Sequence, residues 1–345
     1  MKIVVLAGGI STEREVSIVS GTNVCKALRE IGHDAILMDV YFGDEEKNPD
    51  NAFQGAAYDM ESDLEKIKAH SAHLEEELEK GGEFFGPNVL PICQSCDIVF
   101  LALHGENGEN GKVQAAFDLF NIKYTGTGHL SSAIAMDKGL TKTVLAGSDI
   151  PVPQGIVLEK NGKRKPLSHY GIEFPVVVKP CCGGSSVGVF ITHNEEEYEQ
   201  ALEEAFSYEN EVVVEDYISG REFSVAVIDG QAFPIIEIAP VEGFYDFKNK
   251  YTQGAAIETC PADLPEEKTL EMQLYAVRGT RALMIEGYVR WDFLMNESGK
   301  VFCLEANTLP GMTPTSLMPQ EARAKGIDYP QLCQLLIDSS LKRYE

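Results

Sequence analysis

The first 42 residues alternate between short apolar runs and an amphipathic segment, and this alternation restricts the fold more than any other feature of the chain. Ile3–Leu6 is a buried-strand pattern, and Gly8-Gly9 follows as a turn. Val16–Ile31 has the apolar spacing of a helix, and Ala35–Val40 is a second strand pattern. Strand, helix and strand in this order are typical of a parallel sheet covered by helices. We therefore predict an α/β fold that begins with a parallel-sheet domain.

The stretch from 43 to 95 interrupts this alternation. Glu61–Lys80 is an acidic segment with apolar residues at helical spacing, and Gly81-Gly82 follows it. We predict one helix here, inside an insertion in the N-terminal domain. The strand Asp97–Leu103 resumes the sheet and opens into a polar loop at His104. From about residue 126 the pattern changes to α+β, with helices predicted around 131–146, 195–206 and 263–283 among strands.

Charge and hydropathy exclude two broad classes of function. The 345 residues include 29 Lys and Arg against 54 Asp and Glu, a formal net charge of −25. Nucleic-acid binding depends on clustered basic side chains, so general DNA or RNA binding is excluded. No apolar run approaches the roughly 20 residues that span a bilayer, and the N-terminus has no signal-peptide pattern. We expect a soluble, cytoplasmic protein with no membrane partner.

The segment Gly287–Asn307 reads as a hairpin of two strands around Asn296–Lys300. Because side chains alternate between faces along a strand, the core face is predicted to hold Val289, Trp291, Phe293, Met295, Phe302, Leu304 and Ala306. The other face then carries four polar residues. A four-residue loop, Glu297–Lys300, predicts Asp292 opposite Glu305 and Arg290 opposite Asn307.

Two carboxylates and an amide oxygen on one sheet face form a hard oxygen site that suits Mg²⁺. Arg290 beside them can stabilise phosphate or developing oxyanion charge. The alternative is a solvated sheet face with ordinary cross-strand ion pairs.

Three further patterns favour the metal site. Pro175–Lys179 is a buried strand ending in a lysine, and the glycine-rich Gly183–Gly188 that follows can present backbone N–H groups to phosphate. The alternative for this loop is a plain hairpin turn. Val212–Ile218 is a strand that ends in a polar turn, and the backbone donors and acceptors of such a turn can bind a flat nucleotide base. Asn307–Ser316 continues from the proposed metal strand through a Pro-Gly turn, which would expose the Gly311 N–H and the Ser316 hydroxyl.

These motifs, in this order, resemble the ATP-grasp ligases, and within them the D-alanine–D-alanine ligase family. The resemblance covers nearly the whole chain except the insertion near 43–95. Its carriers are Ser11–Ser17, Leu103–Gly105, Met136–Lys138, Val178–Pro180, Gly184–Gly188, Tyr245–Tyr251, Arg290–Asp292 and Glu305–Met312.

The resemblance implies a three-domain ATP-grasp architecture: an N-terminal substrate domain at 1–125, a central subdomain at 126–214 and a C-terminal subdomain at 215–345. It implies that ATP phosphorylates one D-alanine to an acylphosphate, which the amine of a second D-alanine attacks to give the dipeptide for peptidoglycan precursors. It also implies a homodimer.

The resemblance further assigns the nucleotide and metal residues. Lys138 and Lys179 match contacts to the ATP phosphates, and Glu215, Ile218 and Glu222 match the residues around the nucleoside. The ligands of two Mg²⁺ or Mn²⁺ ions match Asp292, Glu305 and Asn307. Arg290 and the Gly311 N–H match the groups that stabilise the tetrahedral intermediate.

The substrate residues are also assigned by resemblance. Glu15 matches the residue that holds the first substrate's ammonium group, and His104 lies near that substrate. Spacing alone favours the alternative that Thr12 and Glu15 form a capping box for the first helix. Ser316 and Leu317 match the pocket for the second substrate's carboxylate.

Loop contacts complete the expected site. Ser185, Lys250 and Tyr251 match the contacts that close it, and Gly243–Gly254 is a predicted lid. Cys181-Cys182 depart from the family pattern and suggest thiol sensitivity. Two alternatives stay open: a sibling ligase that uses D-serine or D-lactate, and a non-catalytic ATP-binding module. Lactate-using relatives tend to carry histidine at the Tyr251 position, and ADP release dependent on D-alanine would exclude the binding module.

Overall fold

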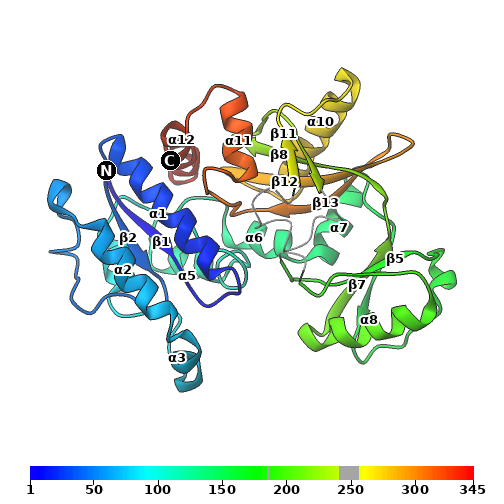
Figure 1. The fold of residues 1–345 in the computed structure, drawn as a ribbon, viewed down its shortest axis with the longest axis horizontal. Helices are drawn as coiled ribbons and strands as arrows, with labels where there is room; N and C mark the ends of the chain where they lie inside the picture. Colours follow the sequence, from blue (N-terminus) through cyan, green and yellow to red (C-terminus); the bar gives the residue numbers. More distant parts are fainter. Residues whose placement is uncertain (185–186, 241–255) are drawn as a thin grey trace. The chain divides into compact units, whose positions relative to one another are not determined.

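The computed structural model describes residues 1–184, 187–240 and 256–345 and consists of two compact units (Figure 1). Unit 1 comprises Met1–Ser132, Ile285–Val289 and Thr308–Glu345, and unit 2 comprises Ala133–Met284 and Arg290–Asn307. The three-domain boundaries at 125 and 214 stay a prediction. Every helix in the described residues is too short or too polar to span a lipid bilayer.

Unit 1 contains the predicted parallel sheet. Its strands are β1 (Lys2–Ala7), β2 (Asp34–Asp39) and β3 (Ile98–Leu101), in the order β2-β1-β3. Both neighbouring pairs run parallel, and the apolar side chains of β1 are fully buried, as expected for a parallel sheet covered on both faces. Helix α1 (Arg14–Glu30) connects β1 to β2 and contacts both strands.

The insertion between β2 and β3 is helical, but its long helix is broken. It contains η1 (Gly55–Ala57), α2 (Met60–Ser71), α3 (Leu74–Lys80) and α4 (Val89–Gln94). The prediction of one helix over 61–80 is therefore wrong. The chain turns between Ser71 and Leu74, where the Ser71 hydroxyl bonds back to the Ile67 carbonyl and accepts from Arg14 Nε of α1 at 2.9 Å. Serine competes with the helix for backbone hydrogen bonds, which accounts for the end of α2.

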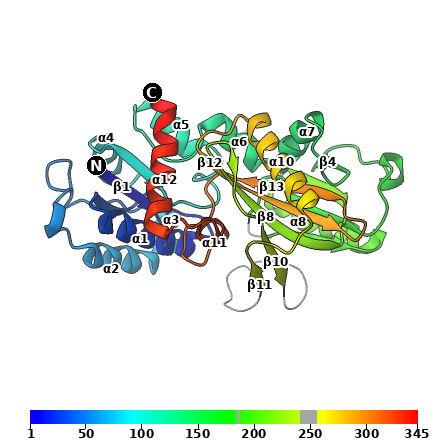
Figure 2. The same cartoon turned by 90° about the horizontal axis from the view of Figure 1, so that it is seen from above.

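The last segment of the chain returns to unit 1 and completes its core. Helix α5 (Lys112–Leu119) belongs to unit 1, whereas α6 (His129–Met136) crosses into unit 2 after Ser132. Unit 1 is finished by α11 (Leu317–Ala324), α12 (Tyr329–Leu341) and η3 (Lys342–Tyr344). Helix α12 packs beside α1 (Figure 2). The Ser340 hydroxyl accepts from the Gly126 N–H at 3.0 Å, and the Tyr344 hydroxyl accepts from the Tyr124 N–H at 3.0 Å.

Unit 2 begins with a four-stranded antiparallel sheet in the order β4-β7-β5-β6. The strands are β4 (Gly155–Glu159), β5 (Val176–Pro180), β6 (Phe190–Thr192) and β7 (Glu211–Asp216), and α8 (Glu195–Tyr208) packs on them. Helix α7 (Lys138–Gly147) precedes this sheet. The single helix predicted around 131–146 is wrong, because Asp137 separates α6 from α7 and its side chain caps α7 by accepting from the Leu140 N–H.

The second sheet of unit 2 follows the order β11-β10-β8-β12-β13, with β9 beside β8. These strands are β8 (Gly220–Ile228), β9 (Gln231–Ala232), β10 (Ile236–Pro240), β11 (Ala256–Thr259), β12 (Tyr288–Asn296) and β13 (Val301–Asn307). Helix α10 (Glu266–Ala282) packs on it through the fully buried Trp291, whose indole donates to Thr280 at 3.0 Å. A Cβ at Gly279 would lie 2.7 Å from that ring, so only glycine allows this approach.

The β12–β13 hairpin has the predicted pairs at its polar end. Arg290 lies opposite Asn307, and Asp292 lies opposite Glu305. Nearer the turn the predicted register is wrong by one residue, because Met295 rather than Asn296 pairs with Val301. The strand bounds still leave the predicted loop Glu297–Lys300 between them. A bulge at Leu304 absorbs the difference, because the register shifts by one residue between Asp292 and Phe293.

The bulge also changes which side chains share a face. Cys303, not Phe302, pairs with Phe293 and is fully buried. The predicted core face of β13 is therefore confirmed for Ala306, which pairs with Trp291. Phe302 is buried as predicted but pairs with Leu294 on the other face, and Leu304 lies in the bulge and is half-buried.

Candidate active site

Two lysines of unit 2 hold the buried carboxylate of Glu215, and a third lysine pairs with Glu305. Lys138 and Lys142 lie one turn apart on α7, and Lys179 is near the end of β5. Lys179 Nζ lies 2.6 Å from Glu215 Oε1, and Lys142 Nζ lies 2.7 Å from Glu215 Oε2. Lys138 Nζ lies 3.4 Å from Glu305 Oε2 and donates to the Gly183 carbonyl. Residues from both sheets of unit 2 thus meet around α7.

The strand register explains why Lys179 and Glu215 meet. Val177 of β5 lies opposite Glu215 of β7, so Lys179, two residues further along, points to the same face. Gly155 of β4 lies on the other side of Glu215. A Cβ at Gly155 would lie 2.8 Å from the Glu215 Cβ, so only glycine fits beside Glu215 without a shift of its side chain.

The charges of this cluster perturb one another. Burial by itself raises the pKa of Glu215, but the charges of Lys142 and Lys179 and their hydrogen bonds outweigh it and hold the pKa below its usual value. Burial lowers the pKa of Lys142, and the Lys179 charge adds to this, while Glu215 opposes it. Paired in this way, the buried charges compensate one another.

Asp292 is the centre of the polar hairpin face. Its Oδ1 accepts from Arg290 Nε at 2.9 Å and from the Ser224 hydroxyl at 3.0 Å. Its Oδ2 accepts from Arg290 Nη2 and Asn307 Nδ2 at 2.7 and 2.9 Å. Asp292 is buried, whereas Arg290, Glu305 and Asn307 are half-buried. The structure therefore brings together the four polar residues that the alternation predicted.

The donor set of this face fits a hard divalent cation. No group of three or more His, Cys, Asp and Glu side chains in residues 1–184, 187–240 and 256–345 is arranged to hold a metal ion. The predicted set has only two carboxylates, Asp292 and Glu305, with the amide oxygen of Asn307. Mg²⁺ is commonly bound by one or two carboxylates that share it with substrate phosphates, and Lys138, which the sequence predicts at the ATP phosphates, lies in contact with Glu305.

The predicted nucleoside residues lie in the same unit. Ile218 follows β7 and is half-buried, and Glu222 is a half-buried residue of β8, paired with Ile238. Ser185, Lys250, Tyr251 and the lid at 243–254 lie outside the described residues.

The predicted substrate residues belong to unit 1. His104 is buried directly after β3, and Gly105 adopts a positive φ of 71°. A Cβ at Gly105 would lie 3.4 Å from Glu13 Oε2, so the His104 loop and the loop before α1 are in contact. Glu13 is buried, whereas Glu15 is exposed. The capping-box alternative is wrong, because α1 begins after Glu13 with no side-chain cap.

The loop before α11 carries the other predicted residues of unit 1. A Cβ at Gly311 would lie 3.0 Å from Ser316 Oγ, so the loop folds back on itself. The Ser316 hydroxyl lies 2.7 Å from the Thr313 hydroxyl and accepts from the Thr313 N–H at 3.1 Å. Leu317 is buried as the first residue of α11.

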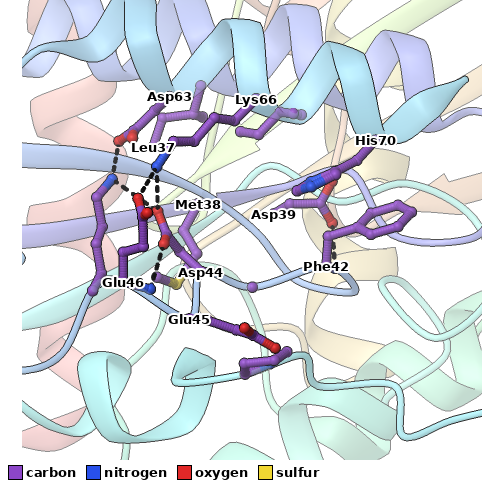
Figure 3. Close-up of a pocket in the computed structure, with 14 residues that line it drawn as sticks. Leu37, Met38, Asp39, Phe42, Asp44, Glu45, Glu46, Asp63, Lys66 and His70 are labelled. Carbon is purple, nitrogen blue, oxygen red and sulfur yellow. Dashed lines mark hydrogen bonds and ion pairs between the residues drawn. The ribbon is translucent and has the colours of Figure 1, made fainter. Parts of the chain in front are cut away.

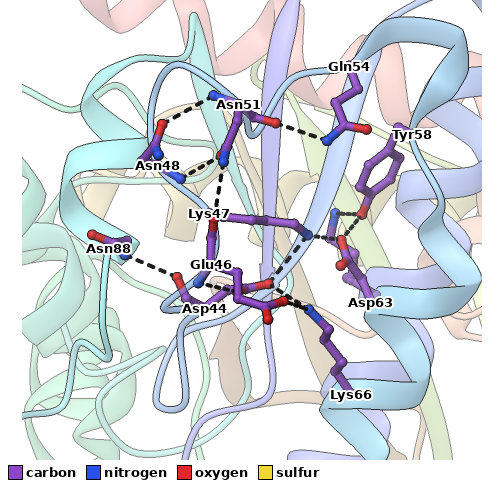
Figure 4. A network of polar contacts seen from close by, with 11 residues as sticks. Asp44, Glu46, Lys47, Asn48, Asn51, Gln54, Tyr58, Asp63, Lys66 and Asn88 are labelled. Carbon is purple, nitrogen blue, oxygen red and sulfur yellow. Dashed lines mark hydrogen bonds and ion pairs between the residues drawn. The ribbon is translucent and has the colours of Figure 1, made fainter.

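A separate hollow of about 390 Å³ lies in unit 1 between β2, α2 and the loop after β2 (Figure 3). The Phe42 and His70 rings stack along its wall with centroids 4.7 Å apart. None of the residues predicted for the site lines it. Its charged side chains pair with one another, with Lys47 against Asp63 and Lys66 2.8 Å from Glu46 (Figure 4). These contacts belong to the packing of the insertion against β2.

Three site residues escaped the sequence analysis. Lys142 follows Lys138 by four residues, which places both on one helix face and could have pointed to it. Ser224 on β8 donates to Asp292 because β8 and β12 are neighbours in the sheet, and this strand order is not visible in the sequence. Glu13 lies only two residues from Glu15, and the sequence pattern does not distinguish them. Which of the two is buried depends on the residue at which α1 begins.

Comparisons with known proteins match both ends of the chain. A family model described as D-ala D-ala ligase N-terminus matches residues 2–127, and one described as D-ala D-ala ligase C-terminus matches residues 144–338. A D-alanine–D-alanine ligase of Pediococcus pentosaceus is 43% identical over 100% of this chain and 99% of its own. The ligase of the same name from Lacticaseibacillus casei is 44% identical over 100% and 97%.

Solved structures agree. The D-alanine–D-alanine ligase from Bacillus anthracis is 32% identical with a TM-score of 0.76, covering 99% of this chain and 98% of its own. The VanG D-Ala:D-Ser ligase from Enterococcus faecalis is 27% identical with a TM-score of 0.76, covering 98% and 99%.

Proposed function

The chain belongs to the D-alanine–D-alanine ligase family, and we propose that it joins two D-alanines through an acylphosphate made with ATP. It is an ATP-dependent ligase, and its dipeptide serves peptidoglycan precursor synthesis. The observation that carries this proposal is that the match to D-alanine–D-alanine ligases extends along the whole chain. The match to the Pediococcus pentosaceus ligase includes 100% of this chain, and the match to the Geobacter sulfurreducens ligase includes 99%.

The basic cluster of unit 2 supplies what the first step needs. A carboxylate is a poor electrophile, and making it an acylphosphate requires two anions, the carboxylate and the triphosphate, to approach. Lys138 and Lys179 are the proposed phosphate contacts. Because both side chains are buried and already held in place, their charges can lower this repulsion with little rearrangement of the surrounding protein. Glu215, Ile218 and Glu222 are proposed to surround the nucleoside.

The polar hairpin face is the proposed metal site. Asp292, Glu305 and Asn307 would hold two Mg²⁺ or Mn²⁺ ions together with the phosphates. When bound, these ions neutralise charge on the transferring phosphoryl group. Arg290 and the Gly311 N–H are proposed to stabilise the tetrahedral intermediate of the second step.

The substrates are proposed to meet unit 1 groups. His104 is proposed beside the first D-alanine, and Ser316 and Leu317 beside the carboxylate of the second. Glu15 stays the family-based prediction for the ammonium contact. The burial of Glu13 and its approach to the His104 loop support Glu13 instead, because a buried carboxylate holds an ammonium more strongly than an exposed one.

The remaining expectations complete the proposal. Ser185, Lys250 and Tyr251 are proposed to close the site. We further propose a homodimer and a cytoplasmic location, both supported by family membership.

One experiment tests the function. The protein is incubated with ATP, Mg²⁺ and an equal mixture of D-alanine, D-serine and D-lactate, and the products are identified by mass spectrometry. We expect D-alanine-dependent ADP release and D-alanyl-D-alanine as the main product. A mixed dipeptide or depsipeptide as the main product would reassign the second substrate. ADP release that does not depend on D-alanine would contradict the ligase function.

A further inference from the structure

Lys142 is a buried cation that none of the sequence motifs explains. It lies on α7 one turn after Lys138, and its side chain is only 9% exposed. Burying an ammonium group is costly unless it is paired. Its ion-pair partner is Glu215, whose other oxygen is held by Lys179 at 2.6 Å.

We propose that Lys142 is a positioning residue for the nucleotide: it shares the Glu215 carboxylate and thereby keeps the Lys179 ammonium available to the ATP phosphates. This inference rests on the proposed function, which places Lys179 at those phosphates. Lys142 itself contacts no phosphate in this scheme and acts through Glu215.

The charges of Lys142, Lys179 and Glu215 favour this role. Two lysines and one carboxylate leave one positive charge in a buried place, and this excess attracts an anion. Without Lys142, Lys179 and Glu215 would form a neutral pair. Lys179 would then have to give up its only counter-charge in order to turn toward a phosphate.

The position of the Glu215 carboxylate between two lysines also favours this role. Glu215 is fully buried, and each of its oxygens is held by a different lysine from a different element, α7 and β5. This two-sided contact fixes the carboxylate plane and therefore the position of Lys179 Nζ. Gly155 lets β4 approach the base of the Glu215 side chain, because a Cβ there would lie 2.8 Å from both the Glu215 Cβ and the Val214 carbonyl oxygen.

The test compares Lys142→Met with Lys142→Arg and the wild type. Binding of ADP with Mg²⁺ is measured by titration without D-alanine, and KM for ATP and kcat are measured in the full reaction. For Lys142→Met we expect ADP binding and KM for ATP to weaken about tenfold, with kcat at saturating ATP changed less than about twofold. Lys142→Arg keeps the charge and should recover most of the affinity.

A matched control uses the same substitution elsewhere in unit 2. Lys160 donates to the Phe206 carbonyl at 2.8 Å and belongs to no proposed site, so Lys160→Met should leave ADP binding unchanged. Unaltered ADP affinity in a folded Lys142→Met protein would overturn the proposal, as would a loss confined to kcat. If Lys142→Met does not fold, Lys142→Gln carries the same expectation, and failure of both neutral variants to fold would assign Lys142 to stability alone.

The proposed function is read separately from these data. Wild-type ADP release that depends on D-alanine tests the ligase activity, whereas the ADP titration needs no D-alanine. Failure of the first with success of the second would leave Lys142 as a nucleotide-positioning residue of a different reaction.

Discussion

Asp292 lies directly opposite Glu305 in the β12–β13 ladder, although near the turn Met295 rather than Asn296 pairs with Val301. The bulge at Leu304 restores the pairing before the polar end is reached. The two carboxylates therefore share one face of the sheet, next to Arg290 and Asn307. A one-residue error there would move Glu305 to the core face.

Removing either carboxylate charge should stop turnover. We expect Glu305→Gln and Asp292→Asn to lower kcat by much more than tenfold, because each side chain is proposed to hold a metal that neutralises the phosphoryl group. Asp292→Asn should also lower the free energy of unfolding by about 1–3 kcal/mol, since it leaves buried donors without their charged acceptor. Steady-state kinetics and thermal unfolding measure the two effects.

The control for these variants is Glu237→Gln on β10, which breaks an exposed ion pair with Arg221 in the same sheet. It should keep near-normal turnover. More than about a tenth of the wild-type rate in a folded Glu305→Gln enzyme, a barrier change below about 1.4 kcal/mol, would contradict the metal assignment.

Glutamine substitution at Glu13 and Glu15 should separate the two candidates for the ammonium contact. Glu13 is buried beside the His104 loop and Glu15 is exposed, so we expect Glu13→Gln to raise KM for D-alanine strongly and Glu15→Gln to have a small effect. Each variant is the other's control. Kinetics at varied D-alanine with saturating ATP decide between them, and the reverse ranking would restore the family-based prediction for Glu15.

Gly155→Ala should weaken nucleotide use. The new methyl group would lie 2.8 Å from the Glu215 Cβ and displace the carboxylate that holds Lys142 and Lys179. We expect a several-fold rise in KM for ATP. Gly147→Ala on α7 is the control, because a Cβ there meets nothing within 4 Å. It should be neutral or stabilise the protein by up to about 1 kcal/mol. Equal KM values for the two variants would contradict the role of Gly155.

Cys181 and Cys182 should react slowly with alkylating reagents. Burial, aided by the charge of Asp137, raises the pKa of Cys181 to about 12, and burial with the Glu209 charge raises that of Cys182 to about 11. Each thiol is therefore protonated at neutral pH, and the thiolate is the reactive form. Mass spectrometry of iodoacetamide-treated protein at pH 7 should show less labelling of Cys182 than of free glutathione. Faster labelling of Cys182 than of glutathione would support the thiol sensitivity that the sequence suggested.

The sequence predicts the parts of this molecule that depend on local periodicity. The β1–α1–β2 order and the Asp292–Glu305 pairing follow from apolar spacing of 3.6 and 2 residues. The Lys142–Glu215 pair does not, because it joins a helix to a strand that are far apart in the chain. Asp137 is a residue type that favours a helix N-cap, but the apolar residues on both sides of it suggested one continuous helix in place of α6 and α7. The choice between Glu13 and Glu15 depends on where α1 begins, and a two-residue difference in a helix start is beyond pattern analysis.

The return of α12 to α1 has a consequence for how the protein is made. A ribosome releases β1, α1, β2 and β3 first, but the surface of α1 that α12 covers stays open until the last segment has emerged. The whole of unit 2 up to Asn307 is synthesised in between. Unit 1 therefore completes its folding only after α12 has emerged from the ribosome. A stop codon before Tyr329 would remove no proposed site residue and would still leave unit 1 without the helix that covers α1.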